Sequence, residues 1–108
     1  MNFKVDTIPL FDKLTKRLVK KYPSLKNELK SLNENLAAKP VQGTFLGNNF
    51  YKLRIAISSK GKGKSGGGRI ITYVKVTANT VYLVYIYDKS ERETISGKEL
   101  EQIFALLP

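Results

Sequence analysis

The stretch RIITYVKVTANTVYLVYIY, residues 69–87, holds two apolar runs with a short polar segment between them. Residues 70–76 are rich in β-branched side chains, which favour strands. Residues 81–87 are apolar on both faces, as is typical of a strand in the interior of a sheet. Ala78, Asn79 and Thr80 between them predict a tight turn. The stretch therefore predicts two antiparallel strands, the second in a central position.

A third strand precedes this pair along the chain. Residues 51–57 (YKLRIAI) alternate between apolar and polar side chains, which places Lys52 and Arg54 on the face opposite the apolar residues. These three strands are expected to form an antiparallel meander. Residues 38–49, which contain Pro40, Gly43 and Gly47, are expected to be a loop.

The first third of the chain predicts a strand followed by a helical hairpin. Residues 3–8 (FKVDTI) alternate with period two, and Pro9 closes the run. Leucines then follow at helical spacing, interrupted by Tyr22, Pro23 and Ser24: Leu10, Leu14, Leu18, Leu25, Leu29, Leu32 and Leu36. Because proline disfavours helix in the residue before it, two helices are expected, with Ser24 as the cap of the second.

The end of the chain predicts a short amphipathic helix. Ser96 and Glu99 have the spacing of a capping box. Apolar residues then follow at helical spacing: Leu100, Ile103, Phe104 and Leu107. The whole pattern predicts an α+β fold in one domain, residues 1–108.

Composition limits the chemistry. The chain has 108 residues, a net charge of +10, no histidine and no cysteine, so a thiol nucleophile and a disulfide framework are absent, and so are the usual general base and metal ligand. We expect no metal and no cofactor. No stretch reaches the length of a membrane span, and the N-terminus lacks the apolar core of a signal peptide, so a soluble cytoplasmic protein is expected.

The positive charge is unevenly distributed. Residues 35–87 contain no Asp or Glu but eight cations: Lys39, Lys52, Arg54, Lys60, Lys62, Lys64, Arg69 and Lys75. If the three strands are neighbours, most of these cations converge on one end of the sheet, which suits a polyanion such as nucleic acid. The alternative is a solvated surface. A second group of cations lies on the first predicted helix, where a solvated surface and a partner-binding role are both open: Lys13, Lys16, Arg17, Lys20 and Lys21.

Residues 58–70 (SSKGKGKSGGGRI) join two of the predicted strands. A nucleotide-binding loop requires a glycine where Ser58 stands and a helix where the β-branched run stands, so that reading fails. A flexible spacer is the simpler reading. In an extended conformation, however, Lys60, Lys62 and Lys64 would point the same way along a nucleic-acid backbone.

The order of elements, together with the segments YKLRIAI, GKGKSGGGRIITYV and VYLVYIYDKSE, resembles the RelE/ParE superfamily of bacterial toxins. The second segment and IYDKSE are most similar to the HigB-type and RelE-type mRNA endonucleases. The resemblance covers nearly the whole chain. It implies a ribosome-dependent ribonuclease that cuts translated mRNA, with contacts to 16S rRNA, and that a cognate antitoxin holds inactive.

The resemblance also implies site residues. Lys52 and Arg54 match basic positions of one family strand, Arg69 matches the arginine that opens the next, and Lys89 matches the basic position after the last strand, with Tyr87 beside it. RelE-type members have a further arginine and a tyrosine where this chain has Ser90 and, approximately, Ser96. This departure leaves the acid–base tyrosine to Tyr87 or Tyr73, or the mechanism to cations alone. A ParE-like inhibitor of DNA gyrase and a non-catalytic nucleic-acid-binding module therefore stay open.

For a ribonuclease, the residues present suit a reaction in which the 2′-hydroxyl of the RNA attacks the neighbouring phosphate. Arg69 would hold the phosphate oxygens through its planar guanidinium. A lysine crowded by other cations, as expected for Lys60, Lys62 and Lys64, has a lowered pKa and can act as a base. Tyr87 would donate a proton or stack on a base.

Overall fold

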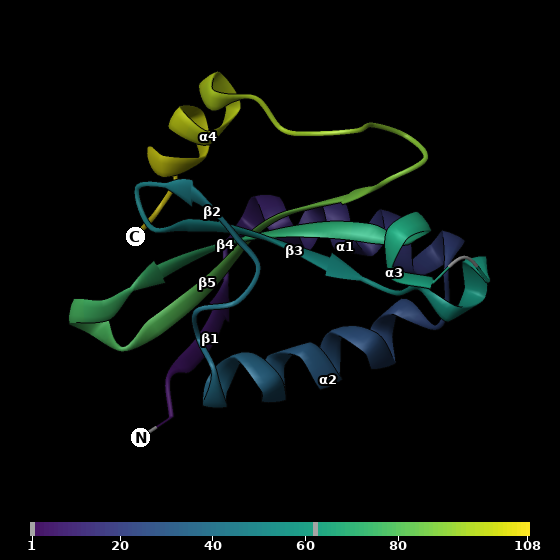
Figure 1. The fold of residues 1–108 in the computed structure, drawn as a ribbon, viewed down its shortest axis with the longest axis horizontal. Helices are drawn as coiled ribbons and strands as arrows, with labels where there is room; N and C mark the ends of the chain where they lie inside the picture. The colour runs from purple at the N-terminus through teal and green to yellow at the C-terminus, as the bar shows by residue number, and fades with distance from the viewer. Residues whose placement is uncertain (1, 62) are drawn as a thin grey trace.

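The computed structural model describes residues 2–61 and 63–108, and its elements follow the predicted order closely (Figure 1). The strands are β1 (Lys4–Thr7), β2 (Thr44–Gly47), β3 (Phe50–Ile55), β4 (Gly68–Lys75) and β5 (Thr80–Asp88). The helices are α1 (Pro9–Lys21), α2 (Leu25–Ala38), α3 (Gly63–Gly66) and α4 (Gly97–Phe104). Short 3₁₀ turns span Ser58–Lys60 and Val76–Ala78.

The five strands form one mixed sheet in the order β1-β5-β4-β3-β2. The meander β3-β4-β5 is antiparallel, as predicted, whereas β1 pairs with β5 in parallel. Because β5 has a neighbour on both sides, it is an interior strand, which confirms the expectation from its apolar sequence.

The strand β2 lies inside the segment expected to be a loop. It pairs with β3 through a two-residue turn at Asn48 and Asn49, flanked by the paired residues Gly47 and Phe50. Both asparagines have positive φ, as the hairpin turn of type I′ requires, and asparagine tolerates that conformation. The glycines and asparagines that indicated a loop therefore form the turn of a short hairpin.

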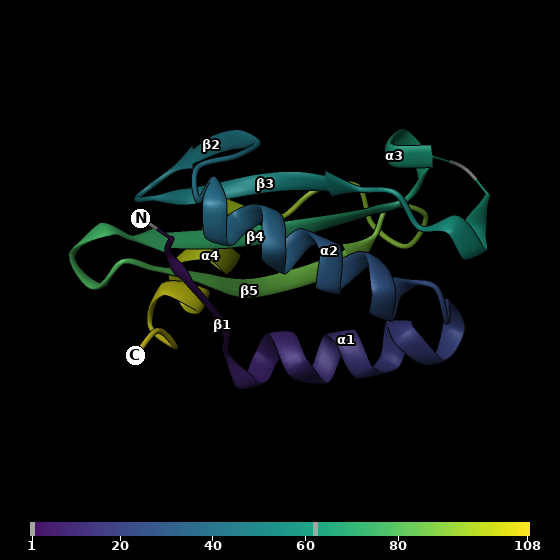
Figure 2. The ribbon, with the colours of Figure 1, turned by 90° about the horizontal axis from the view of Figure 1, so that it is seen from below.

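The helices α1 and α2 cover one face of the sheet (Figure 2). Leu18, Leu25 and Leu36 from these helices are fully buried in the core, together with Leu53, Ile70 and Ile86 from the sheet. The predicted break at Pro23 is confirmed, because α1 ends at Lys21 and α2 begins at Leu25.

Ser24 stands at the N-cap position of α2, as predicted, but its side chain makes no capping hydrogen bond. Its hydroxyl donates to the carboxylate of Glu28 at 3.1 Å and accepts the backbone N–H of Ser59 at 2.9 Å, instead of an N–H of its own helix. Glu28 in turn accepts hydrogen bonds from the backbone and the hydroxyl of Ser58. The first turn of α2 therefore anchors the start of the glycine-rich segment.

The helix α4 lies on the opposite face of the sheet from α1 and α2 (Figures 1 and 2). Its predicted capping box is present, with both hydrogen bonds between Ser96 and Glu99. Phe104 of α4 packs edge-on against Phe50 and Tyr73, with ring centroids 6.4 and 5.9 Å apart. In the part of the chain that the structure describes, no helix has the length and apolarity to cross a membrane.

The glycine-rich segment is not extended, so the predicted row of lysines is wrong in its geometry. The segment consists of the 3₁₀ turn, a left-handed Gly61 and the short helix α3, which begins at a left-handed Gly63. Residue 62 lies outside the described part, as do the side chains of residues 64 and 65.

Candidate nucleic-acid interface

Three residues predicted as site residues stand in one row across the sheet. Arg54 of β3 is directly opposite Arg69 of β4, and Arg69 is directly opposite Tyr87 of β5. Residues paired in this way point to the same face. Lys52, Ile71 and Tyr85 form the adjacent row. The two rows bring together three cations and two tyrosines, with no acidic residue in either row.

The rows lie on the face that carries α4. In the regular strand β3, Phe50 has the same orientation as Lys52 and Arg54, and Phe50 contacts Phe104 of α4. The helix covers the Phe50 end of this face. The arginine row lies at the other end, where the segment after β5 turns back on the side of α4 (Figure 1).

Arg54 and Arg69 differ in exposure. Arg54 is exposed, whereas Arg69 is 6% exposed and donates a hydrogen bond to the carbonyl of Gly68 at 3.0 Å. Like charges directly opposite each other destabilise a sheet, and an anion bound between them removes that repulsion. A pair of arginines in this register therefore suits the binding of a phosphate group.

Tyr87 is 3% exposed, and its hydroxyl has no hydrogen-bond partner among the described residues. Burial raises the pKa of this phenol, against the opposing effect of the nearby Arg69 and Arg92. The hydroxyl therefore keeps its proton at neutral pH. A buried unsatisfied donor is costly for the folded state, and each such group calls for an explanation, of which a catalytic role is one.

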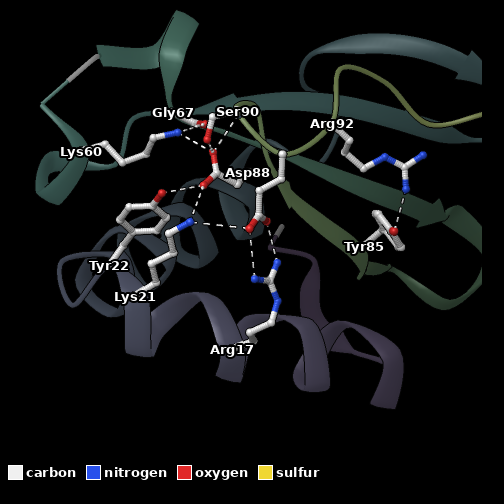
Figure 3. Close-up of polar contacts among 10 residues, drawn as sticks. Arg17, Lys21, Tyr22, Lys60, Gly67, Tyr85, Asp88, Ser90 and Arg92 are labelled. Atoms are coloured by element: carbon white, nitrogen blue, oxygen red, sulfur yellow. Dashed lines mark hydrogen bonds and ion pairs between the residues drawn. The ribbon is translucent and has the colours of Figure 1, made fainter.

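Arg92 is a residue of this face that the sequence did not indicate. Its guanidinium lies 5.7 Å from the ring centroid of Tyr85 and 5.5 Å from that of Tyr87, and it donates to the Tyr85 hydroxyl at 2.9 Å (Figure 3). It also forms a two-pronged ion pair with Glu99 of α4, at 2.9 and 2.6 Å. Arg92 lies in an irregular loop, so no periodic pattern in the sequence marks it as a site residue. The one available indication was that Tyr85 and Tyr87 share a face of β5, where a cation could pack against their rings.

The substitution Glu99→Gln is expected to weaken the dependence of the free energy of unfolding on pH at acid pH. Arg92 and Ser96 lower the pKa of Glu99 to about 2 from its ordinary value of 4.5. The ionised carboxylate therefore stabilises the fold above about pH 4.5, and this contribution is lost as the pH falls toward 2. Glutamine keeps the capping contacts and has no charge to lose. In urea unfolding, the difference between wild type and variant should be largest above about pH 5 and smallest near pH 2, and a constant difference would contradict the assignment.

Two other predicted residues lie apart from the rows. Lys89 follows β5 at the Arg69 end of the sheet, where its backbone N–H donates to the carbonyl of Gly67 at 3.1 Å. Its ammonium group is 3.9 Å from Glu93. Tyr73 lies at the α4 end, where its ring packs against Phe50 at 5.2 Å and against Phe104. The structure thus brings Lys89, but not Tyr73, to the arginine end of the face.

Lys60 is turned into the protein. Its side chain is 5% exposed and pairs with the carboxylate of Asp88, which is fully buried (Figure 3). The expectation that Lys60 belongs to an exposed crowd of cations is therefore wrong, because a buried carboxylate captures its ammonium group. Lys62 lies outside the described residues, and the backbone of Lys64 lies in α3.

Comparisons with known proteins show the family and the fold. The family described as "RelE toxin of RelE / RelB toxin-antitoxin system" matches residues 10–106. Among solved structures, a double arginine-to-alanine mutant of Escherichia coli RelE in the free state matches with a TM-score of 0.59 and 14% identity over 98% of this chain and 94% of that chain. A metal-bound toxin from Helicobacter pylori matches with a TM-score of 0.52 and 24% identity, covering 82% of this chain and 97% of that chain.

Proposed function

Because the chain belongs to the RelE family of toxins of toxin–antitoxin systems, we propose that it cuts translated mRNA on the ribosome and that a cognate antitoxin protein holds it inactive. The observation that carries this proposal is the row of Arg54, Arg69 and Tyr87, with Arg92 beside it. Three cations around a buried phenol suit an RNA phosphate whose charge increases during reaction. Contacts with 16S rRNA are part of the proposal.

The proposed reaction is a transesterification within the RNA. The 2′-oxygen forms a bond to the adjacent phosphorus and loses its proton, the bond from phosphorus to the 5′-oxygen breaks, and the leaving oxygen takes up a proton. The products are a 2′,3′-cyclic phosphate and a free 5′-hydroxyl. The reaction needs a proton acceptor, cations for the phosphorane and a proton donor.

We assign these roles to the residues of the arginine end. Arg69, with Arg54 at the surface, binds the phosphate oxygens, and Lys52 binds the neighbouring RNA backbone. Tyr87 donates the proton to the leaving oxygen, because its buried hydroxyl carries a proton and has no partner among the described residues. Lys89 is the first candidate for the proton acceptor, and Lys64 is the second.

This assignment is supported by the residue that stands where RelE-type members have their tyrosine. Ser96 stands approximately there, and its hydroxyl accepts the backbone N–H of Glu99 at 3.1 Å as the cap of α4. A capping serine does not replace a phenol as an acid, so the proposal gives that role to Tyr87 on the adjacent strand.

A reconstituted translation system tests the proposed function. Purified toxin is added to ribosomes translating a defined mRNA, and 5′ ends are mapped, with the Lys89→Ala variant as a control. The proposal is supported if cleavage requires translation and if Lys89→Ala cleaves less than the wild type. Intact transcripts together with inhibited DNA supercoiling by gyrase would favour the ParE-like alternative. Salt-dependent RNA binding without cleavage or toxicity would favour a binding module.

The Tyr87→Phe substitution is expected to separate catalysis from stability. Removing a buried hydroxyl without a partner should leave the free energy of unfolding unchanged or raise it by up to about 1 kcal/mol. Cleavage should fall by about 100-fold, because the leaving oxygen loses its proton donor. Single-turnover cleavage and urea unfolding measure the two effects. Tyr82→Phe, at the other end of β5, is the matched control, and unchanged cleavage in Tyr87→Phe would remove Tyr87 from the mechanism.

A further inference from the structure

Asp88 is a buried acid at the end of the strand that carries Tyr87. It is the last residue of β5, and its side chain is fully buried. Four groups surround the carboxylate (Figure 3). Lys60 and the backbone N–H and hydroxyl of Ser90 donate to one oxygen, and the Tyr22 hydroxyl donates to the other at 2.6 Å. The ammonium group of Lys21 lies 3.9 Å away.

These contacts join three parts of the chain at one point. Tyr22 comes from the end of α1, Lys60 from the glycine-rich segment, and Ser90 from the turn after β5. We call the set of Lys21, Tyr22, Lys60, Asp88 and Ser90 the Asp88 cluster. The cluster lies beneath the end of the sheet that carries the arginine row, because Asp88 is paired with Gly68 and follows Tyr87.

The cluster fixes the backbone on both sides of the arginine row. Lys60 donates a second hydrogen bond, at 3.3 Å, to the carbonyl of Gly67, two residues before Arg69. The same carbonyl accepts the N–H of Lys89. The carbonyl of Asp88 accepts the N–H groups of Glu91 and Arg92 at 3.0 and 3.2 Å, which forms the turn that leads to Arg92.

A buried ion pair is a poor way to stabilise a fold, because desolvation opposes the attraction between the charges and apolar residues of similar size often do as well. Burial by itself raises the pKa of Asp88, but the hydrogen bonds from Lys60, Tyr22 and Ser90 outweigh it and lower the pKa. The carboxylate is therefore charged at neutral pH. Its directed hydrogen bonds do what apolar packing does not, since they set the positions of particular backbone groups.

From this geometry we propose that Asp88 is a positioning residue of the cleavage site, which acts through Lys60 and Ser90 to hold Arg69 and the segment 89–92 in the arrangement that binds the reacting phosphate. The inference rests on the proposed function. It predicts that the charge of Asp88 affects the chemical step more than the affinity for RNA, because Arg54 and Lys52 lie outside the cluster's reach and still attract the polymer.

The test uses three variants of the full chain. Asp88→Asn removes the charge at nearly constant shape. Asp88→Asn/Lys60→Met removes both charges, so that no buried ion is left alone. Asp6→Asn is the matched control, because it removes a carboxylate that pairs with Lys4 at 3.8 Å on the edge strand β1, away from the cluster. Single-turnover cleavage on translating ribosomes gives the maximal rate and the half-saturating toxin concentration, and urea unfolding gives the stability of each variant.

Asp88→Asn is expected to cleave at least about 30-fold more slowly at saturation, with its half-saturating concentration changed by less than about threefold. The double variant is expected to recover stability but to stay slow, because Asp88→Asn removes the charge that holds Ser90 and Lys60→Met removes the donor to the Gly67 carbonyl. Asp6→Asn is expected to cleave normally. If the double variant recovers both stability and rate, or if Asp88→Asn cleaves at the wild-type rate, the cluster has only a structural role and the inference is overturned.

A second readout separates this inference from the proposed function. In NMR spectra of the free protein, Asp88→Asn is expected to shift the Nε–Hε signals of Arg69 and Arg92 and to speed amide exchange at residues 89–92, while Asp6→Asn leaves the two arginine signals in place. If the wild type cleaves no transcript, the proposed function fails and these spectra decide the inference. Unchanged arginine signals and unchanged exchange in Asp88→Asn would then overturn it.

Discussion

Arg69→Ala is expected to lower the rate of mRNA cleavage by about 100-fold, which corresponds to about 3 kcal/mol of lost transition-state stabilisation. Arg69 lies at the centre of the row, opposite both Arg54 and Tyr87, which is the position that the proposed mechanism requires of a group that contacts the reacting phosphate. Arg69→Lys keeps the charge but loses the planar fork that holds two oxygens at once. We expect this variant to remain at least about tenfold slower than wild type.

The measurement is single-turnover cleavage on translating ribosomes, with urea unfolding of each variant, because Arg69 is buried and its loss also affects packing. Lys75→Ala is the matched control, since Lys75 lies on the same strand at the opposite end, paired with Thr80. A folded Arg69→Ala protein that cleaves at the wild-type rate would contradict the proposed mechanism.

Gly67→Ala is expected to destabilise the protein by about 3 kcal/mol, at the upper end of the cost of overpacking. A Cβ at this position would lie much closer than 3.0 Å to the backbone carbonyl oxygen of Ile55. A backbone atom of β3 cannot move aside as a flexible side chain can, so β3 and the start of β4 must separate. This separation would also displace Arg69, and cleavage should fall in the folded fraction as well.

Gly97→Ala is the control for this substitution, because nothing lies within 4 Å of a Cβ there. Its stability should equal or slightly exceed that of wild type, since alanine favours the helix that begins at this residue. Comparable unfolding midpoints for Gly67→Ala and wild type would show that β3 and β4 tolerate a wider spacing than the structure indicates.

The features that were predictable from sequence are those that local periodicity determines. The alternation in β3 placed Lys52 and Arg54 on one face, and the apolar run of β5 marked an interior strand. The capping box at Ser96 and the break at Pro23 are local hydrogen-bonding and steric effects, so they needed no knowledge of the tertiary structure. The arginine row followed from these strands once their register was known.

The features that sequence missed depend on contacts between distant segments. Lys60 meets Asp88 across 28 positions, and Ser24 meets Ser59 across 35, and no local pattern predicts such pairs. Arg92 lies in an irregular loop, and its place over Tyr85 and Tyr87 is set by Glu99 on α4. One weak indication of Asp88 was present in the sequence, where an acidic residue stands at the end of a strongly apolar strand.

The parallel pairing of β1 with β5 has a consequence for when the chain can fold during its synthesis. Residues 4–7 lie at the edge of the sheet and pair with residues 80–83, so β1 stays without its partner strand until residues 80–83 have been translated. The register of β5 also aligns Tyr87 with Arg69, so the arginine row forms at the same late stage. In a nascent chain the arginine row can therefore form only after residues 80–87 have been translated, which delays any activity until that point.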